Sequence, residues 1–193
     1  SDEDSKIVVL SAVSGTTNSL VAIAEALYKK DKNKVDGLVT DLYESYKVFI
    51  VTLYPSENAL EKGQVVIDTH FDIIRDMISN DFTDKEERIL LAQGELMSTQ
   101  LFTHFCHQEE IDAELIWALD FMSTDEFSEP DLSSISKKLT SVVGNTKSKI
   151  LITQGFVCLN SEGEVDNLKR GGSDYTASLI GAAIEASEVQ IWT

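Results

Sequence analysis

Basic residues are scarce in this sequence. Its 193 residues include 16 Lys and Arg against 33 Asp and Glu, which gives a formal net charge of −17. Proteins that bind nucleic acids need clustered basic side chains against the phosphate backbone, so we expect no nucleic-acid partner. A polyanionic ligand would need local help from Mg²⁺, backbone N–H groups and a few basic side chains.

Cysteines and long apolar runs are scarce too. Cys106 and Cys158 are the only cysteines, a poor disulfide framework for a chain of this length. No apolar run approaches the roughly 18 residues of a membrane span, and the N-terminus lacks a signal-peptide pattern. We therefore expect a cytoplasmic protein without a membrane partner. Because His104 and His107 lack a third ligand at suitable spacing, we also predict no metal site.

Apolar patterns predict alternating strands and helices. Strands are expected at residues 6–10, 112–119, 149–153 and 189–192, with two short strands around a turn at residues 160–163. Helices are expected at residues 19–30, 133–143 and 175–186. Such alternation is typical of an α/β fold, here a three-layer sandwich with a mainly parallel central sheet.

A helical block interrupts this alternation. Residues 38–108 are predicted to be mostly helical, in segments at about 38–53, 59–78 and from 83 onward, and we interpret the block as a helical insertion or lid. The third segment contains Gly94, which costs about 1 kcal/mol relative to alanine in a helix and suggests close approach by another group. The adjacent Glu95 could reach a ligand amine or simply face solvent.

Two loops are candidate binding sites. Gly171 and Gly172 precede a helix opened by Ser173 or Asp174, whose first turn would favour an anion. Arg170 adds a planar guanidinium group, which can donate two parallel hydrogen bonds to a carboxylate or phosphate. The alternative is a glycine loop before a capped helix. The loop of small hydroxyl residues at 11–18 follows a buried strand in the same way, and there Thr17 or Asn18 could merely cap the next helix.

Several motifs together resemble the catalytic domain of aspartate kinases, in the amino acid kinase superfamily. The matching segments occur in the family's order over nearly the whole chain. They are Val8-Val9-Leu10-Ser11-Ala12-Val13-Ser14-Gly15-Thr16-Thr17-Asn18, Gly94-Glu95-Leu96-Met97-Ser98, Ile152-Thr153-Gln154-Gly155-Phe156, Arg170-Gly171-Gly172-Ser173-Asp174-Tyr175-Thr176-Ala177 and Ile191-Trp192-Thr193.

The resemblance implies transfer of the γ-phosphoryl group of ATP, with Mg²⁺, to the side-chain carboxylate of L-aspartate, the first step toward lysine, threonine and methionine. It also implies the substrate contacts. Arg170 would grip the α-carboxylate with help from Ser173, Glu95 would pair with the amine, and Thr17 would hydrogen-bond the substrate. Ser11 would lie in the first phosphate-side loop.

The remaining implied roles concern phosphate and nucleotide. Asp174 matches the family's active-site aspartate, which orients the reacting groups. Gly15, Gly171 and Gly172 would turn backbone N–H groups toward the transferred phosphoryl group. Thr193 matches the first residue of a nucleotide-binding Thr-Asp pair. No protein metal ligand is assigned.

The chain departs from the family pattern at both ends. The strand with Lys-Phe-Gly-Gly-Thr-Ser that opens aspartate kinases is absent, as are the regulatory ACT domains, so residues 1–193 are interpreted as a partial catalytic domain. We expect weak aspartate binding and no kinase activity from this chain alone, and a homodimer for the intact enzyme. A kinase for another small amino acid carboxylate, or a non-catalytic domain of the same fold, are the alternatives.

Overall fold

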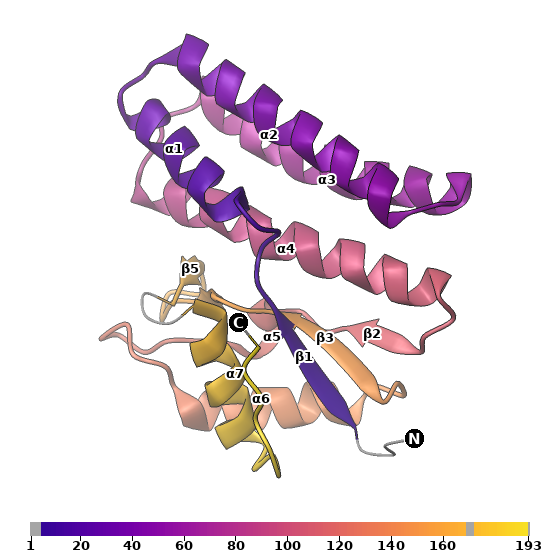
Figure 1. Cartoon of the computed structure of the whole chain (residues 1–193). Helices are drawn as coiled ribbons and strands as arrows, with labels where there is room; N and C mark the ends of the chain where they lie inside the picture. Colours follow the sequence, from indigo (N-terminus) through magenta and orange to yellow (C-terminus); the bar gives the residue numbers. More distant parts are fainter. Residues whose placement is uncertain (1–4, 169–171, 193) are drawn as a thin grey trace. The chain divides into compact units, whose positions relative to one another are not determined.

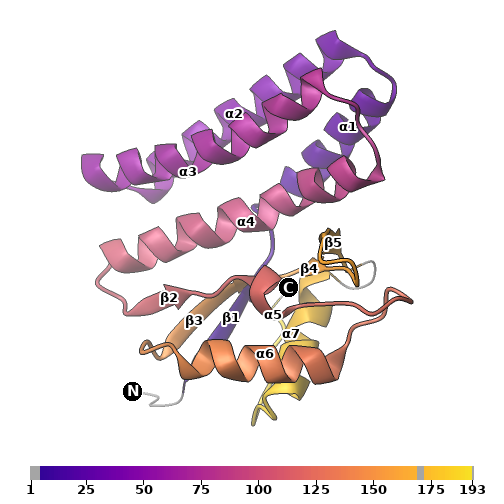
Figure 2. The same cartoon turned by 180° about the vertical axis from the view of Figure 1, so that it is seen from behind.

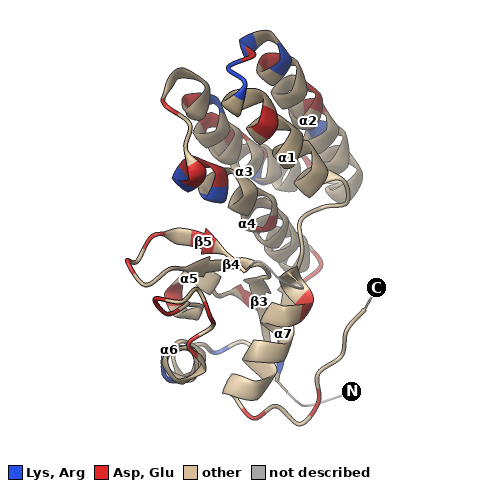
Figure 3. Ribbon diagram, turned by 90° about the vertical axis from the view of Figure 1, so that its left-hand side faces the viewer, with Lys and Arg blue, Asp and Glu red and all other residues tan. Residues whose placement is uncertain are grey.

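The computed structural model describes residues 5–168 and 172–192, which fall into two compact units (Figure 1). The α/β unit contains the chain up to Ser11 and again from Asp112 onward, and the helical unit is Ala12–Ile111. Within the described ranges, no helix is both long and apolar enough to span a membrane. Asp and Glu are distributed over both units (Figure 3).

A parallel sheet forms the centre of the α/β unit. Strand β3 (Ile150–Gln154) lies between β1 (Lys6–Leu10) and β2 (Ala113–Leu115). The register aligns Lys6 with Ile150 and Leu10 with Gln154, so β1 and β3 end together. The apolar run in β3 fits a buried central strand, whereas β1 is only partly buried. The predicted α/β fold with a mainly parallel sheet is confirmed.

Three helices accompany this sheet: α5 (Ala118–Phe121), α6 (Leu132–Gly144) and α7 (Gly172–Ala183). Alternation along the strands directs Ile7, Val9 and Leu151 to one face, where they pack with α6 and α7 (Figure 1). The buried side chains of this core are Ile116, Ala118, Phe121, Met122, Ile135, Leu139, Leu151, Cys158, Leu168, Ile180 and Ala183.

A short antiparallel hairpin follows β3. Strands β4 (Val157–Leu159) and β5 (Val165–Asn167) pair around a turn in which the side chain of Asn160 accepts hydrogen bonds from the N–H groups of Glu162 and Glu164. Gly163 has a φ of 78°, which glycine adopts without strain. The turn predicted at residues 160–163 is confirmed.

The helical unit is a closed bundle of four helices: α1 (Thr16–Tyr28), α2 (Lys32–Leu53), α3 (Glu57–Asp76) and α4 (Asp84–Gln108), with a 3₁₀ turn, η1 (Met77–Ser79), after α3. Each helix packs on the next, and α4 returns to α1 (Figure 2). Asp31, Ser56 and Thr83 cap the last three helices, Thr83 through a reciprocal capping box with Glu86.

Several sequence-based boundaries were wrong. Helix α2 begins at Lys32 instead of residue 38, and α7 already includes Gly172, ahead of Ser173 and Asp174. Residues 189–192 form no strand, and Trp192 is 86% exposed, because no described strand pairs with this apolar run. Strand β2 stops at Leu115, and the buried side chain of Gln154 instead accepts a hydrogen bond (2.8 Å) from the N–H of Ala118 at the start of α5. Helix α1 begins at Thr16 after Gly15, so Thr17 lies inside it and does not cap it.

Candidate functional site

Three segments of the α/β unit converge where β1 and β3 end. Ser11 directly follows β1, and its hydroxyl donates a hydrogen bond (2.7 Å) to the hydroxyl of Ser173 in the first turn of α7. Gly155 follows β3, and its N–H donates to the carbonyl of Leu10 (2.9 Å). The carboxyl edge of a parallel sheet is where α/β proteins place ligands, so this convergence is a candidate binding edge.

The absence of a side chain at Gly155 permits this convergence. A Cβ atom there would lie 2.2 Å from Ser173 Oγ and 2.6 Å from Ser173 Cα. The next residue, Phe156, has a φ of 67°, and its N–H donates to the buried hydroxyl of Thr176 (2.9 Å). Positive φ at a non-glycine residue persists only where surrounding contacts enforce it, and it is concentrated at functional sites.

The first turn of α7 supplies unpaired backbone N–H groups at this edge. It contains three predicted site residues, Gly172, Ser173 and Asp174, and the Asp174 side chain is exposed. These N–H groups and the positive end of the helix dipole favour an anion. Three other predicted site residues, Arg170, Gly171 and Thr193, lie outside the described residues.

The helical unit contains a second group of predicted site residues at the start of α1. Gly94 on α4 packs against this region: a Cβ atom there would lie 2.8 Å from Ala12 Cβ and 3.2 Å from Thr16 Cγ2. The close approach predicted from Gly94 is therefore confirmed. Gly15, at a φ of 85°, turns the chain into α1, and Thr17 is exposed in its first turn.

Glu95 is the least expected residue of this second group. It is only 4% exposed, so the solvent-facing alternative is wrong. Its Oε2 atom has no hydrogen-bond partner among the described residues. Burial raises the pKa of this carboxyl to about 7, although hydrogen bonds from the backbone N–H groups of Glu95 and Ala12 act in the opposite direction. Burial of a carboxylate is costly unless a positive charge offsets it, so this site favours a proton or a cation beside Glu95.

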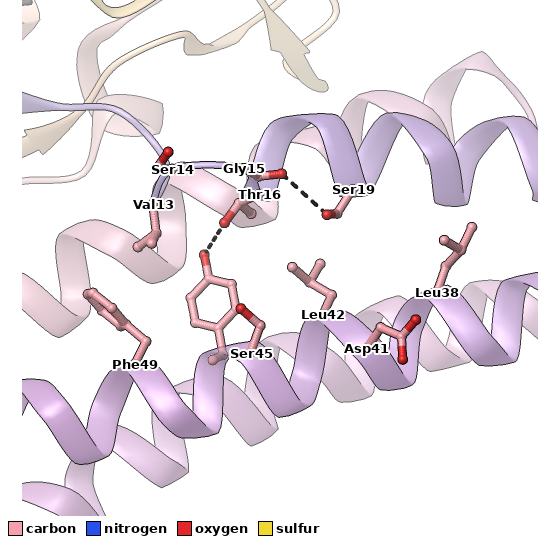
Figure 4. A pocket seen from close by; sticks show the side chains of 11 residues that line it. Val13, Ser14, Gly15, Thr16, Ser19, Leu38, Asp41, Leu42, Ser45 and Phe49 are labelled. Atoms are coloured by element: carbon pink, nitrogen blue, oxygen red, sulfur yellow. Dashed lines mark hydrogen bonds between the residues drawn. The ribbon is translucent and has the colours of Figure 1, made fainter.

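Tyr46 on α2 is hydrogen-bonded to α1 and feels the charge of Glu95. It is 2% exposed and shares a hydrogen bond of 3.0 Å with the buried hydroxyl of Thr16. Burial raises the pKa of Tyr46 to about 12; the Thr16 hydrogen bond opposes this shift, and the charge of Glu95 adds to it. The ring of Tyr46 also lines a cavity of about 300 Å³ between α1 and α2, which Figure 4 shows with the Thr16–Tyr46 contact.

The structure thus divides the described site residues into two groups. Ser11, Gly172, Ser173 and Asp174 belong to the α/β unit, and Gly15, Thr17 and Glu95 belong to the helical unit. Within the described ranges, no three His, Cys, Asp or Glu side chains gather as metal ligands would.

Sequence reasoning assigned no role to several residues that shape these groups: Gly155, Phe156, Thr176, Thr16 and Tyr46. A glycine directly after a buried strand could have indicated Gly155. Nothing in the pattern of α2 distinguishes Tyr46 from an ordinary core residue, because its importance depends on partners from other helices.

Comparison with known proteins gives one consistent result. A model of the amino acid kinase family matches residues 1–193. Lysine-sensitive aspartokinase 3 of Escherichia coli is 33% identical over 201 residues, covering 100% of this chain and 43% of that protein. An aspartokinase of Chlamydia muridarum is 29% identical, covering 99% of this chain and 42% of that protein. The chain therefore spans less than half the length of these curated relatives.

Comparison with solved structures also finds aspartate kinases. Escherichia coli aspartokinase III in complex with aspartate and ADP matches with a TM-score of 0.69 and 28% identity, covering 97% of this chain and 42% of that chain. The same enzyme in complex with lysine and aspartate matches with a TM-score of 0.68 and 29% identity over the same shares. Clostridium acetobutylicum aspartate kinase, at 19% identity and a TM-score of 0.75 over 97% of this chain and 40% of that chain, supports the fold.

Proposed function

Since this chain belongs to the amino acid kinase family, we propose that it serves the ATP-dependent phosphorylation of the side-chain carboxylate of L-aspartate. The observation that carries the proposal is Glu95, a buried carboxyl with an unpartnered oxygen. Such a group favours a ligand that brings its own positive charge, and the ammonium group of an amino acid does so. The aspartate complexes of the Escherichia coli relative support this choice of ligand.

The other assignments follow the chemistry of aspartate. Arg170 binds the α-carboxylate with two parallel hydrogen bonds, as a guanidinium does best. Ser173 and Ser11, which are already hydrogen-bonded to each other, add hydroxyl groups. Thr17 hydrogen-bonds the substrate from the exposed first turn of α1, and Glu95 pairs with the amine.

Phosphoryl transfer itself asks for positioning and neutralisation of charge rather than covalent work by the protein. The accepting carboxylate is ionised at neutral pH, so it needs no strong general base. We assign Asp174 the role of orienting charge and assign Gly15, Gly171 and Gly172 the role of presenting N–H groups. Thr193 contacts the nucleotide. Mg²⁺ bound to ATP is held largely by phosphate oxygens and water, so no protein ligand is assigned.

Calorimetry with three related ligands tests the substrate assignment. L-aspartate, succinate, which lacks the amine, and N-acetyl-L-aspartate, in which it is uncharged, are titrated into the chain. We expect binding of aspartate and at least tenfold weaker binding of the other two. Equal affinity for all three, or no binding of aspartate, would contradict the proposal.

An arginine variant tests the carboxylate contact. Arg170→Ala should weaken aspartate binding by about 2–5 kcal/mol, the loss expected for a hydrogen-bonded charge pair. Arg75→Ala is the matched control, because Arg75 pairs with the exposed Asp72 on its own helix.

A further inference from the structure

The cavity of about 300 Å³ between α1 and α2 has been given no role so far (Figure 4). It lies within the helical unit, and its volume is at the lower end of the range typical of small-molecule sites. Of the predicted site residues that the structure describes, Gly15 lines the cavity, whereas Ser11, Thr17 and Glu95 do not. The cavity therefore adjoins the start of α1 but lies outside the contacts proposed for aspartate.

Apolar side chains form much of the cavity wall. Leu42 is buried, whereas Val13, Leu38 and Phe49 pack against the core of the helical unit and stay partly exposed. A ligand that covers these side chains removes apolar surface from water, and this burial favours binding. The wall therefore suits a ligand with an apolar body, and Phe49 in particular suits a planar ring.

Part of the polar lining is already paired within the protein. The hydroxyl groups of Thr16 and Tyr46 share a hydrogen bond of 3.0 Å, and the hydroxyl of Ser19 donates to the carbonyl of Gly15 (3.2 Å) (Figure 4). The first of these bonds joins α1 to α2 across the cavity wall. The cavity is thus formed before any ligand binds, which reduces the entropic cost of binding.

The charge at the cavity comes from Asp41 on α2. Among the described residues that line the cavity, it is the one carboxylate, and no lysine, arginine or histidine accompanies it. Asp41 is exposed, as is Ser45 one helical turn further along α2. Helix α1 begins at the same cavity, but the positive end of its dipole amounts to only about half an elementary charge. Since the whole chain has a net charge of −17, the cavity favours a cation over an anion.

A metal ion does not fit this lining. Calcium and magnesium need several oxygen ligands, and in the described part of the chain no three His, Cys, Asp or Glu side chains gather around one point. An apolar wall also offers a bare ion no ligands. A cation that carries its own apolar body, by contrast, uses both the carboxylate and the wall.

We propose that the cavity between α1 and α2 is a binding site for a small organic cation. Its ammonium group pairs with Asp41, and its apolar body packs on Leu42 and Phe49. This inference does not rest on the proposed function, because aspartate has a net negative charge and no apolar body and is therefore a poor ligand for this cavity.

Benzylammonium is the probe, with benzyl alcohol and benzoate as neutral and anionic counterparts of similar size. Each is titrated into the isotope-labelled chain while backbone amide signals are followed by NMR. We expect benzylammonium to bind with a dissociation constant on the order of 1 mM and to shift the amides of Gly15, Asp41 and Ser45. Benzyl alcohol should bind about threefold to fivefold more weakly, since it lacks the charge of an exposed ion pair, and benzoate more weakly still.

Two variants locate the site. Asp41→Asn should weaken benzylammonium binding about threefold to fivefold and leave benzyl alcohol unaffected. Asp36→Asn is the matched control, because Asp36 is exposed on the same helix but does not line the cavity. Ser45→Phe fills the cavity from an exposed position and should weaken both probes. Circular dichroism checks that each variant keeps its helical content.

The outcomes separate this inference from the proposed function. Equal affinity for benzylammonium and benzyl alcohol, unchanged affinity in Asp41→Asn, or no saturable shifts at the cavity would overturn the inference and leave the proposed function standing. Displacement of benzylammonium by L-aspartate would also overturn it, because the cavity would then belong to the aspartate site. Failure of aspartate to bind, with benzylammonium bound as expected, would overturn the proposed function alone.

Discussion

The two units present polar groups in opposite ways. The α/β unit places small, partly exposed groups at its candidate edge: the Ser11–Ser173 hydroxyl pair and the first turn of α7. The helical unit instead buries large titratable side chains, Glu95, Tyr46 and His70. Hydroxyl and backbone N–H groups can bind anions that keep part of their hydration shell. A carboxylate buried away from water instead favours binding of a cation. The two units therefore favour ligand groups of opposite charge.

The largest expected effect is a pH dependence confined to the helical unit. The folded pKa of Glu95, about 7, lies above its unfolded value, so the folded state binds more protons between the two values. Stability should therefore fall as the pH rises from about 5 to about 8, by about 3 kcal/mol. Urea unfolding followed by far-UV circular dichroism measures it, and Glu95→Gln should abolish the fall.

His70 provides an internal check on the direction in which stability changes with pH. Its folded pKa is lowered by burial, so the unfolded state binds the extra proton and stability should fall as the pH drops through the unfolded value of about 6.5. In Glu95→Gln only this opposite slope should remain, with a contribution from His104, whose pKa burial also lowers. A profile with the same slope in both proteins would show that Glu95 is not the group responsible.

The next effect concerns packing in the α/β unit. Gly155→Ala forces a Cβ into the backbone and side chain of Ser173 and should destabilise this unit by about 2–3 kcal/mol. Trp117 and Trp192 are the only tryptophans, and both belong to the α/β unit, so their fluorescence in urea follows it selectively.

Substitution of a matched glycine in the helical unit should have the opposite effect on stability. Gly37 lies inside α2 with nothing within 4 Å of an added Cβ, so Gly37→Ala should stabilise the helical unit by about 0.5–1 kcal/mol. Equal effects of the two substitutions on stability would show that Gly155 is not packed more tightly than Gly37.

An effect between those of the two glycine substitutions is expected from the buried hydroxyl pair of the helical unit. Tyr46→Phe leaves the buried Thr16 hydroxyl without its 3.0 Å partner and should cost about 1–2 kcal/mol. Thr16→Val in the same background should add little, because the pair is already broken. Strictly additive losses in this double-mutant cycle would show that the two hydroxyls do not interact.

The two units also differ in what the sequence revealed. Apolar runs and turn residues predicted β1, β3 and the hairpin, because those patterns are local. The segment at residues 189–192 has the same apolar character but pairs with no described strand, so the strand predicted there from the local pattern was wrong. The motif around Gly94 predicted close approach, yet neither the burial of Glu95 nor its link to Tyr46 could be predicted, since both depend on side chains brought together by three helices.

The smallest stability effect should come from the hydroxyl pair of the α/β unit. Because folding should hardly change, substitutions there report on ligand binding alone. Ser11→Ala and Ser173→Ala each remove one partner of an exposed hydrogen bond, which should change stability by less than about 0.5 kcal/mol. If these hydroxyls contact the substrate, each variant should still weaken aspartate binding several-fold in calorimetry. Ser178→Ala is the control, because its hydroxyl bonds only the carbonyl of Asp174 within α7. Unchanged affinity in both test variants would restrict these two hydroxyls to a structural role and leave aspartate recognition to the other assigned residues.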